Sequence, residues 1–208
     1  MLFDSPAVLA PESVLNWLAL CVAGLAREEQ EAYRLHNAAL PLPHALNEEL
    51  GVGASQADIV KHFIACRLEL ELTAVLTMTA AAEAKIRLDA ISRIENGTDN
   101  FAKRLKFLRS RVQLPWAIPL YEDGIVDAWK TFIGSLADIP DRERAQCLNA
   151  VGCYRNLLNI RHWVAHGRYW RPKWGAERFV PADVAETIRD LYDTLRQVAI
   201  HGDVMSFA

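Results

Sequence analysis

The chain has 208 residues, of which 51% are hydrophobic, so it can bury one substantial core and is about the size of a single domain. Its formal net charge of −3 excludes a globally basic nucleic-acid-binding protein, and any contact with RNA must come from a local basic patch. The four cysteines are scattered without a CxxC spacing, which argues against a zinc site or a disulfide framework and favours a reduced, cytoplasmic setting.

Helix start and stop signals divide the chain into successive helices. Prolines in the first turn, or capping residues before it, mark the starts, and Asn96-Gly97 marks a stop. Ser55 and Asp58 have the spacing of a capping box, although the stricter form has Glu or Gln at the second position. The predicted helices span residues 11–38, 55–95, 101–112, 125–136, a segment beginning at 140, and 181–200, and the predicted loops include 41–53 and 115–119. Because no stretch alternates apolar and polar residues, we predict an all-α antiparallel helical bundle without strands.

Two apolar runs could be mistaken for membrane segments. They cover residues 14–26 and 72–82, and both are shorter than the ~20 residues that cross a bilayer. The first run is preceded by Asp4 and Glu12 and by no Lys or Arg, which argues against a secretory signal. We therefore expect two buried helices and no membrane partner.

Residues 155–170 form the densest group of polar, titratable and aromatic side chains in the chain. Arg155, Asn159, His162 and His166 follow steps of four, three and four, so they lie on one stripe of a helix. The stripe holds two imidazoles and neither Glu nor Lys. Because Arg stabilises phosphate charge and His moves protons near neutral pH, this pattern favours phosphodiester chemistry. The alternative is a helix end whose basic groups only complement the helix dipole.

The same segment supplies a local basic patch, because it carries five basic residues up to Lys173 and no acid. Interleaved aromatic residues can stack on unpaired bases, whereas Trp163 is expected to pack the end of the bundle. The candidate RNA-binding residues are Arg155, Asn156, Asn159, Arg168 and Tyr169.

The long helix predicted at 55–95 carries two acid–arginine pairs, Glu83 with Arg87 and Asp89 with Arg93, each four residues apart. Two interpretations stay open. The pairs can form a solvated face, where each contributes only ~0.2–0.5 kcal/mol. Alternatively, this helix packs beside the helix of residues 155–170, and Glu83 or Asp89 orients an arginine or a histidine there.

The segment Arg161-His162-Trp163-Val164-Ala165-His166-Gly167 resembles the signature of the HEPN domains (higher eukaryotes and prokaryotes nucleotide-binding). That signature is an Arg, a polar residue directly after it, a gap of four to six residues and a His, often followed by Gly. In this chain Arg161, His162 and His166 fill the three positions. The resemblance implies a HEPN-type bundle at about residues 55–200, with an N-terminal helix and loop at 1–54, in one domain spanning residues 1–208.

The resemblance also implies an activity. Many members of the family are metal-independent endoribonucleases that act as toxins or antiviral defence effectors, and active members form homodimers with the two motifs facing each other. We therefore expect RNA and, for a toxin, an antitoxin protein as partners, and neither a cofactor nor a metal. Catalytic roles fall to Arg161, His166 and His162.

Alternatives follow from geometry and from the family itself. Arg161 and His166 are about 140° apart on an ideal helix, so the helix ends early, a second subunit contributes, or the two act across a cleft. Some HEPN members only bind, so a non-catalytic module that binds RNA, a nucleotide or a protein is the main alternative. A zinc hydrolase using both histidines is disfavoured, because Trp163 stands where the metalloprotease motif has Glu.

Overall fold

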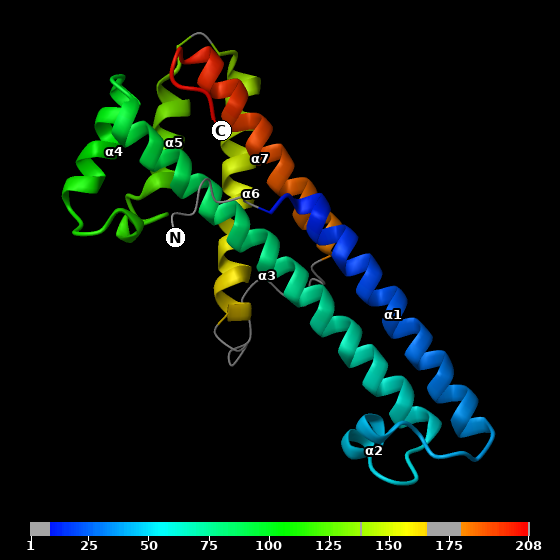
Figure 1. The fold of residues 1–208 in the computed structure, drawn as a ribbon. Coiled ribbons are helices and arrows are strands. Elements are labelled where there is room, and N and C mark those ends of the chain that lie inside the picture. The colour runs from blue at the N-terminus through cyan, green and yellow to red at the C-terminus, as the bar shows by residue number, and fades with distance from the viewer. Residues whose placement is uncertain (1–8, 138, 166–179, 208) are drawn as a thin grey trace.

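The computed structural model describes residues 9–137, 139–165 and 180–207. Within these ranges the regular structure is helical throughout and contains no strand, as predicted (Figure 1). The helices are α1 (Pro11–Asn37), α2 (His44–Leu50), α3 (Gln56–Asn96), α4 (Asn100–Ser110), the 3-10 helix η1 (Pro115–Ala117), α5 (Ile125–Ser135), α6 (Asp141–Ala165) and α7 (Pro181–His201). Their order follows the predicted order, with α2 and η1 added inside predicted loops.

Helix α3 begins and ends where the sequence signals predict. At its start the Ser55 hydroxyl accepts from the Asp58 amide at 3.3 Å, and the Asp58 carboxylate accepts from the Ser55 amide at 3.0 Å, which completes the capping box. At its end Gly97 has φ −80°, so the left-handed cap that Asn-Gly suggests is not formed. A Cβ on Gly97 would lie 2.6 Å from the Ala102 Cβ, so the glycine allows α4 to approach closely.

Helix α3 joins two parts of the molecule. Its first half pairs with α1, and its second half packs among α4, α5, α6 and α7 (Figure 1). The paired part has a small core of its own, built from Ala32, Leu42, Ile59 and Phe63. The larger core surrounds the second half of α3 and includes Trp129.

Two expectations about the N-terminal part were wrong. The predicted loop 41–53 contains the seven-residue helix α2, whose leucines pack against the small core; a helix this short depends on such packing. The run 14–26 is not buried throughout, because α1 packs with one side along α3 and α7. Val14 and Leu18 are buried, but Leu20 is 75% exposed. Among the described residues, no helix has the length and hydropathy to span a membrane.

The motif helix packs against the long helix, as predicted. Helix α6 contacts α3, α5 and α7, and Figure 1 shows it crossing α3. Leu157, Leu158 and Ile160 face the core, which leaves the other side of α6 toward solvent. Helix α6 is described as far as Ala165; the helix end predicted at Gly167 lies outside the described residues.

Candidate functional site

Glu83 connects α3 to the motif on α6. One of its carboxylate oxygens lies 3.0 Å from the Arg87 Nε and the other lies 3.5 Å from the Arg161 Nε. The Glu83 side chain is 15% exposed and that of Arg161 is 37% exposed. The Arg161 Nε is buried and has no hydrogen-bond partner among the described residues, so its contact with Glu83 is an ion pair. Arg161 is therefore held on one side by a largely buried carboxylate, and more than a third of its side chain is exposed.

Arg87 ties the segment after α4 to this cluster. Its Nη1 donates to the carbonyl of Trp116 at 3.0 Å and to the carbonyl of Ile118 at 2.7 Å. The i, i+4 pair expected from the sequence is present, but Arg87 also fixes a loop 30 or so residues away in sequence. The Arg87 guanidinium therefore positions both the Glu83 carboxylate and that loop.

The segment from Pro119 to Gly124 turns sharply. The amides of Ile125 and Val126 donate to the carbonyls of Pro119 and Leu120 at 2.8 and 2.7 Å. Within this turn Glu122 and Asp123 have φ of +58° and +67°, a region that non-glycine residues rarely adopt.

Gly124 makes this turn possible, because a Cβ there would lie 2.1 Å from the Pro119 carbonyl oxygen. The turn holds Tyr121 against the motif helix, where the Arg155 Cζ lies 6.0 Å from the centre of the Tyr121 ring.

A cavity of about 290 Å³ opens between α3, α6 and this turn. Its lining combines the Arg161 cluster, the turn and the exposed His162. The lining residues are Glu83, Arg87, Pro119, Leu120, Tyr121, Glu122, Leu158, Arg161 and His162. The structure therefore brings Arg161, His162 and Glu83 together, and places Arg155 at the neighbouring Tyr121.

Other predicted site residues lie elsewhere or are not described. Asn156 and Asn159 are exposed on α6 and do not line the cavity. His166, Arg168 and Tyr169 lie outside the described residues, so the motif is seen only through its first half.

Asp89 lies in the core, where it pairs with Arg93 and not with Arg161. Its carboxylate lies 2.8 Å from the Arg93 Nε, and the side chains are 1% and 0% exposed. The Arg93 guanidinium stands 4.8 Å from the Trp129 ring centre and 5.3 Å from that of Phe101. Burial raises the pKa of Asp89, and the hydrogen bond and charge of Arg93 oppose that rise. Of the two carboxylates considered, Glu83 contacts Arg161 and Asp89 pairs with Arg93, so among the described residues the contact expected of either one is made by Glu83.

The sequence did not single out Tyr121 or Glu122. The two prolines bracketing 115–119 indicated a loop, but two successive non-glycine residues with positive φ have no sequence signature. The Gly124 that follows them is the available signal, and alone it identifies a turn and not a site.

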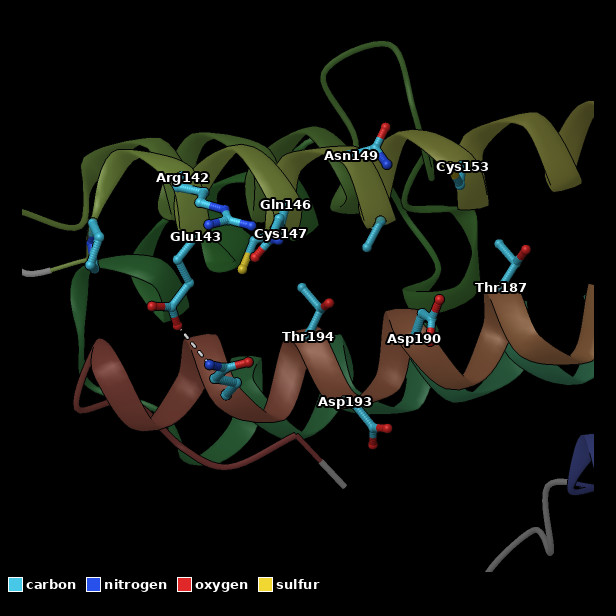
Figure 2. Close-up of a pocket in the computed structure, with 13 residues that line it drawn as sticks. Arg142, Glu143, Gln146, Cys147, Asn149, Cys153, Thr187, Asp190, Asp193 and Thr194 are labelled. Atoms are coloured by element: carbon cyan, nitrogen blue, oxygen red, sulfur yellow. Dashed lines mark hydrogen bonds between the residues drawn. The ribbon is translucent and has the colours of Figure 1, made fainter.

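A second, larger hollow of about 710 Å³ lies between α6 and α7 (Figure 2). Figure 2 shows Gln146, Asn149, Thr187 and Thr194 along it, and the Glu143 carboxylate accepts from the Gln197 amide at 2.6 Å. Burial raises the pKa of the Cys147 thiol in its wall, which disfavours the nucleophilic thiolate. Volume alone does not make this groove an active site, because it lacks the Arg–His combination of the smaller cavity.

Metal binding finds no support in the described part of the chain. Within it, no three His, Cys, Asp or Glu side chains are grouped so as to hold a metal ion, and the four cysteines are free. A zinc site built on His162 and His166 cannot be placed, because His166 is outside the described residues.

No protein-family model matches the chain, and neither a curated protein nor a solved structure matches it at significant similarity.

Proposed function

We propose that the chain is a metal-independent endoribonuclease of HEPN type that cleaves single-stranded RNA, as a toxin or an antiviral defence effector. One observation carries the proposal: Arg161, held by the largely buried Glu83, lines one cavity together with His162. A positioned guanidinium beside an imidazole is the pair that charge stabilisation and proton transfer at a phosphodiester require.

In the proposed reaction the ribose 2′-oxygen attacks the adjacent phosphorus. His166 takes the 2′-OH proton as the new O–P bond forms, and His162 gives a proton to the 5′-oxygen as the old P–O bond breaks. Arg161 stabilises the negative charge of the pentacoordinate phosphorane. The products are a 2′,3′-cyclic phosphate and a 5′-hydroxyl. Since the nucleophile belongs to the RNA, no metal-bound water is needed, and DNA is spared because it lacks the 2′-OH.

The polar side of α6 extends this site. Asn156 and Asn159 are exposed and available to phosphate oxygens, and Arg155 stands beside Tyr121. Arg168 and Tyr169 complete the proposed RNA-binding set. The exposed polar face of α6 also suits an isologous homodimer in which a second motif faces the first. Light scattering at micromolar concentration tests this, because a monomer would contradict the dimer.

A non-catalytic binding module is the second candidate. One observation favours it: Glu83 and Glu122 place two carboxylates at the cavity, which lowers the positive potential available to a phosphate. The two candidates differ in pH dependence. Catalysis by two imidazoles gives a bell-shaped rate profile, whereas binding weakens steadily as histidine loses its charge.

The deciding experiment measures RNA cleavage in EDTA and thermal stability on the same variants. We expect His166→Ala to lose about 10²–10⁴-fold in rate and Arg161→Lys to lose most activity, because lysine lacks the planar fork that grips two oxygens. Both should keep the wild-type melting temperature. Matched controls are His44→Ala, whose side chain is 86% exposed, and Arg142→Lys, exposed on α6. Full cleavage by folded His166→Ala, or loss of wild-type cleavage in EDTA, would overturn the mechanism.

A further inference from the structure

The turn at Pro119–Gly124 presents two side chains to the cavity of Arg161. Tyr121 is half-buried and lies beside the Arg155 guanidinium, and the neighbouring Glu122 is exposed. Glu122 is held at φ +58° by a turn that two backbone hydrogen bonds close. Such backbone conformations persist only where the surroundings enforce them, and they concentrate at sites that bind ligands. The proposed catalytic chemistry uses neither side chain.

We infer that this cavity is a base-specificity subsite for RNA and that it selects guanine next to the cleaved phosphate. The inference rests on the proposed ribonuclease function, because it assigns the base partner of the phosphate that Arg161 would hold. An unpaired base stacks on Tyr121 beside the Arg155 guanidinium, and its Watson–Crick edge meets the Glu122 carboxylate. Aromatic and guanidinium planes are the usual platforms for unpaired RNA bases.

The carboxylate is what selects guanine. Its two oxygens only accept hydrogen bonds, and guanine offers two adjacent donors, the N1–H and the N2 amino group. Adenine and cytosine present one amino donor beside a ring-nitrogen acceptor, and uracil presents one N–H between two carbonyl oxygens. Each of these edges sets an acceptor against the carboxylate, which costs more than a missing contact.

The size and position of the cavity fit a single nucleotide. About 290 Å³ lies just below the ~300–1,000 Å³ range of small-molecule sites, a volume that suits a single base. Since Arg161 and His162 line the same cavity, a base seated on Tyr121 has its phosphate close to the proposed catalytic groups. The base site and the proposed catalytic Arg161 and His162 would then be positioned by the same elements, α3, α6 and the turn.

The first test maps cleavage sites on a random-sequence single-stranded RNA in EDTA. We expect guanine at one position next to the cut, favoured about tenfold or more over other bases. Glu122→Gln should abolish this preference, because an amide offers one acceptor and one donor. Asp123→Asn is the matched control, since Asp123 has the same backbone conformation but does not line the cavity. Tyr121→Leu should raise KM about tenfold and Tyr121→Phe should not.

Wild-type cleavage without a base preference, or a guanine preference that survives in Glu122→Gln, would overturn the subsite and leave the ribonuclease proposal intact. A second arm does not depend on cleavage. The full chain is titrated with guanosine and cytidine 5′-monophosphates, followed by NMR. We expect guanosine monophosphate to bind at least tenfold more tightly and Glu122→Gln to remove the difference. Equal binding, or no binding of either, would overturn the subsite. Wild-type protein that does not cleave but shows this guanine-selective binding would refute the ribonuclease and keep the subsite as a nucleotide site.

Discussion

Two acid–arginine pairs on α3 share one spacing and have different environments. Asp89 and Arg93 are 1% and 0% exposed, and the Arg93 guanidinium lies against the Trp129 ring, so each is the other's hydrogen-bonded partner within the core. Glu83 and Arg87 are 15% and 23% exposed, and the free oxygen of Glu83 reaches Arg161 on another helix. The comparison teaches that an i, i+4 pattern reports only that two side chains are neighbours. Their tertiary neighbours decide whether the pair closes on itself or positions a third charge.

The largest expected effect is on stability, when the buried pair Asp89–Arg93 is disrupted. Asp89→Asn leaves the Arg93 charge buried without a counter-charge, so the free energy of unfolding should fall by about 3–5 kcal/mol. Denaturant titration measures this. The control is Asp141→Asn, which removes an exposed pair with Arg144 (2.7 Å, Asp141 side chain 96% exposed) and should cost at most about 1 kcal/mol. Equal costs in the two variants would show that burial does not distinguish the pairs.

Disruption of the pair Glu83–Arg87 should change activity more than stability. Glu83→Gln removes the charge that holds Arg161, so we expect RNA cleavage to fall about 10- to 100-fold. The melting temperature should change much less than in Asp89→Asn. Glu95→Gln, exposed on the same helix, serves as the control. If Glu83→Gln lowers stability and activity in the same proportion, Glu83 is structural and does not position Arg161.

The two pairs also show which features of the fold can be predicted from the sequence. Helix order, the capping box at Ser55 and the stop at Gly97 follow from local signals, because each depends on residues within a few positions. Helix α2 was missed because its stability comes from Leu46 and Leu50 packing on the small core. Likewise, no residue within five positions of Asp89 predicts that Trp129 will pack against Arg93.

The sequence identified the part of the candidate site on α6 and, as one of two alternatives, Glu83 on α3. Arg161, Arg155 and His162 were identified from composition and motif. Tyr121 and Glu122 were not identified, because their place at the cavity depends on a turn that Arg87 ties down from 30 or so residues away. Such long-range constraints have no local pattern to detect.

Alkaline titration tests a third buried group, the phenol of Tyr192, which is neutral where the two pairs are charged. Burial raises the pKa of Tyr192 to about 12 from 10.0. The unfolded chain ionises first, so this stability is fully present below pH ~10 and is lost as the pH rises toward 12. The free energy of unfolding should therefore fall across that window, and less steeply in Tyr192→Phe. Equal slopes in both proteins would mean that Tyr192 does not carry the effect.

The smallest effect is expected at Tyr154, which lies between the core and the cluster of Glu83. Its hydroxyl is buried and has no hydrogen-bond partner among the described residues. Burial, followed by the negative charge of Glu83, raises the pKa of this phenol. Tyr154→Phe removes an unsatisfied polar atom and keeps the ring, which should leave stability unchanged or raise it by up to about 1 kcal/mol.

Cleavage by Tyr154→Phe should stay within about twofold of wild type, because no direct hydrogen bond joins the phenol to Glu83. Denaturant titration and the EDTA cleavage assay on one preparation measure both quantities. Tyr192→Phe, the other buried tyrosine of this core, is the control for removing a phenolic hydroxyl. A fall in cleavage that matches Glu83→Gln, with stability unchanged, would contradict this expectation. It would show that Tyr154 helps to position the pair Glu83–Arg87. Tyr154 would then belong to the candidate site as well as to the core.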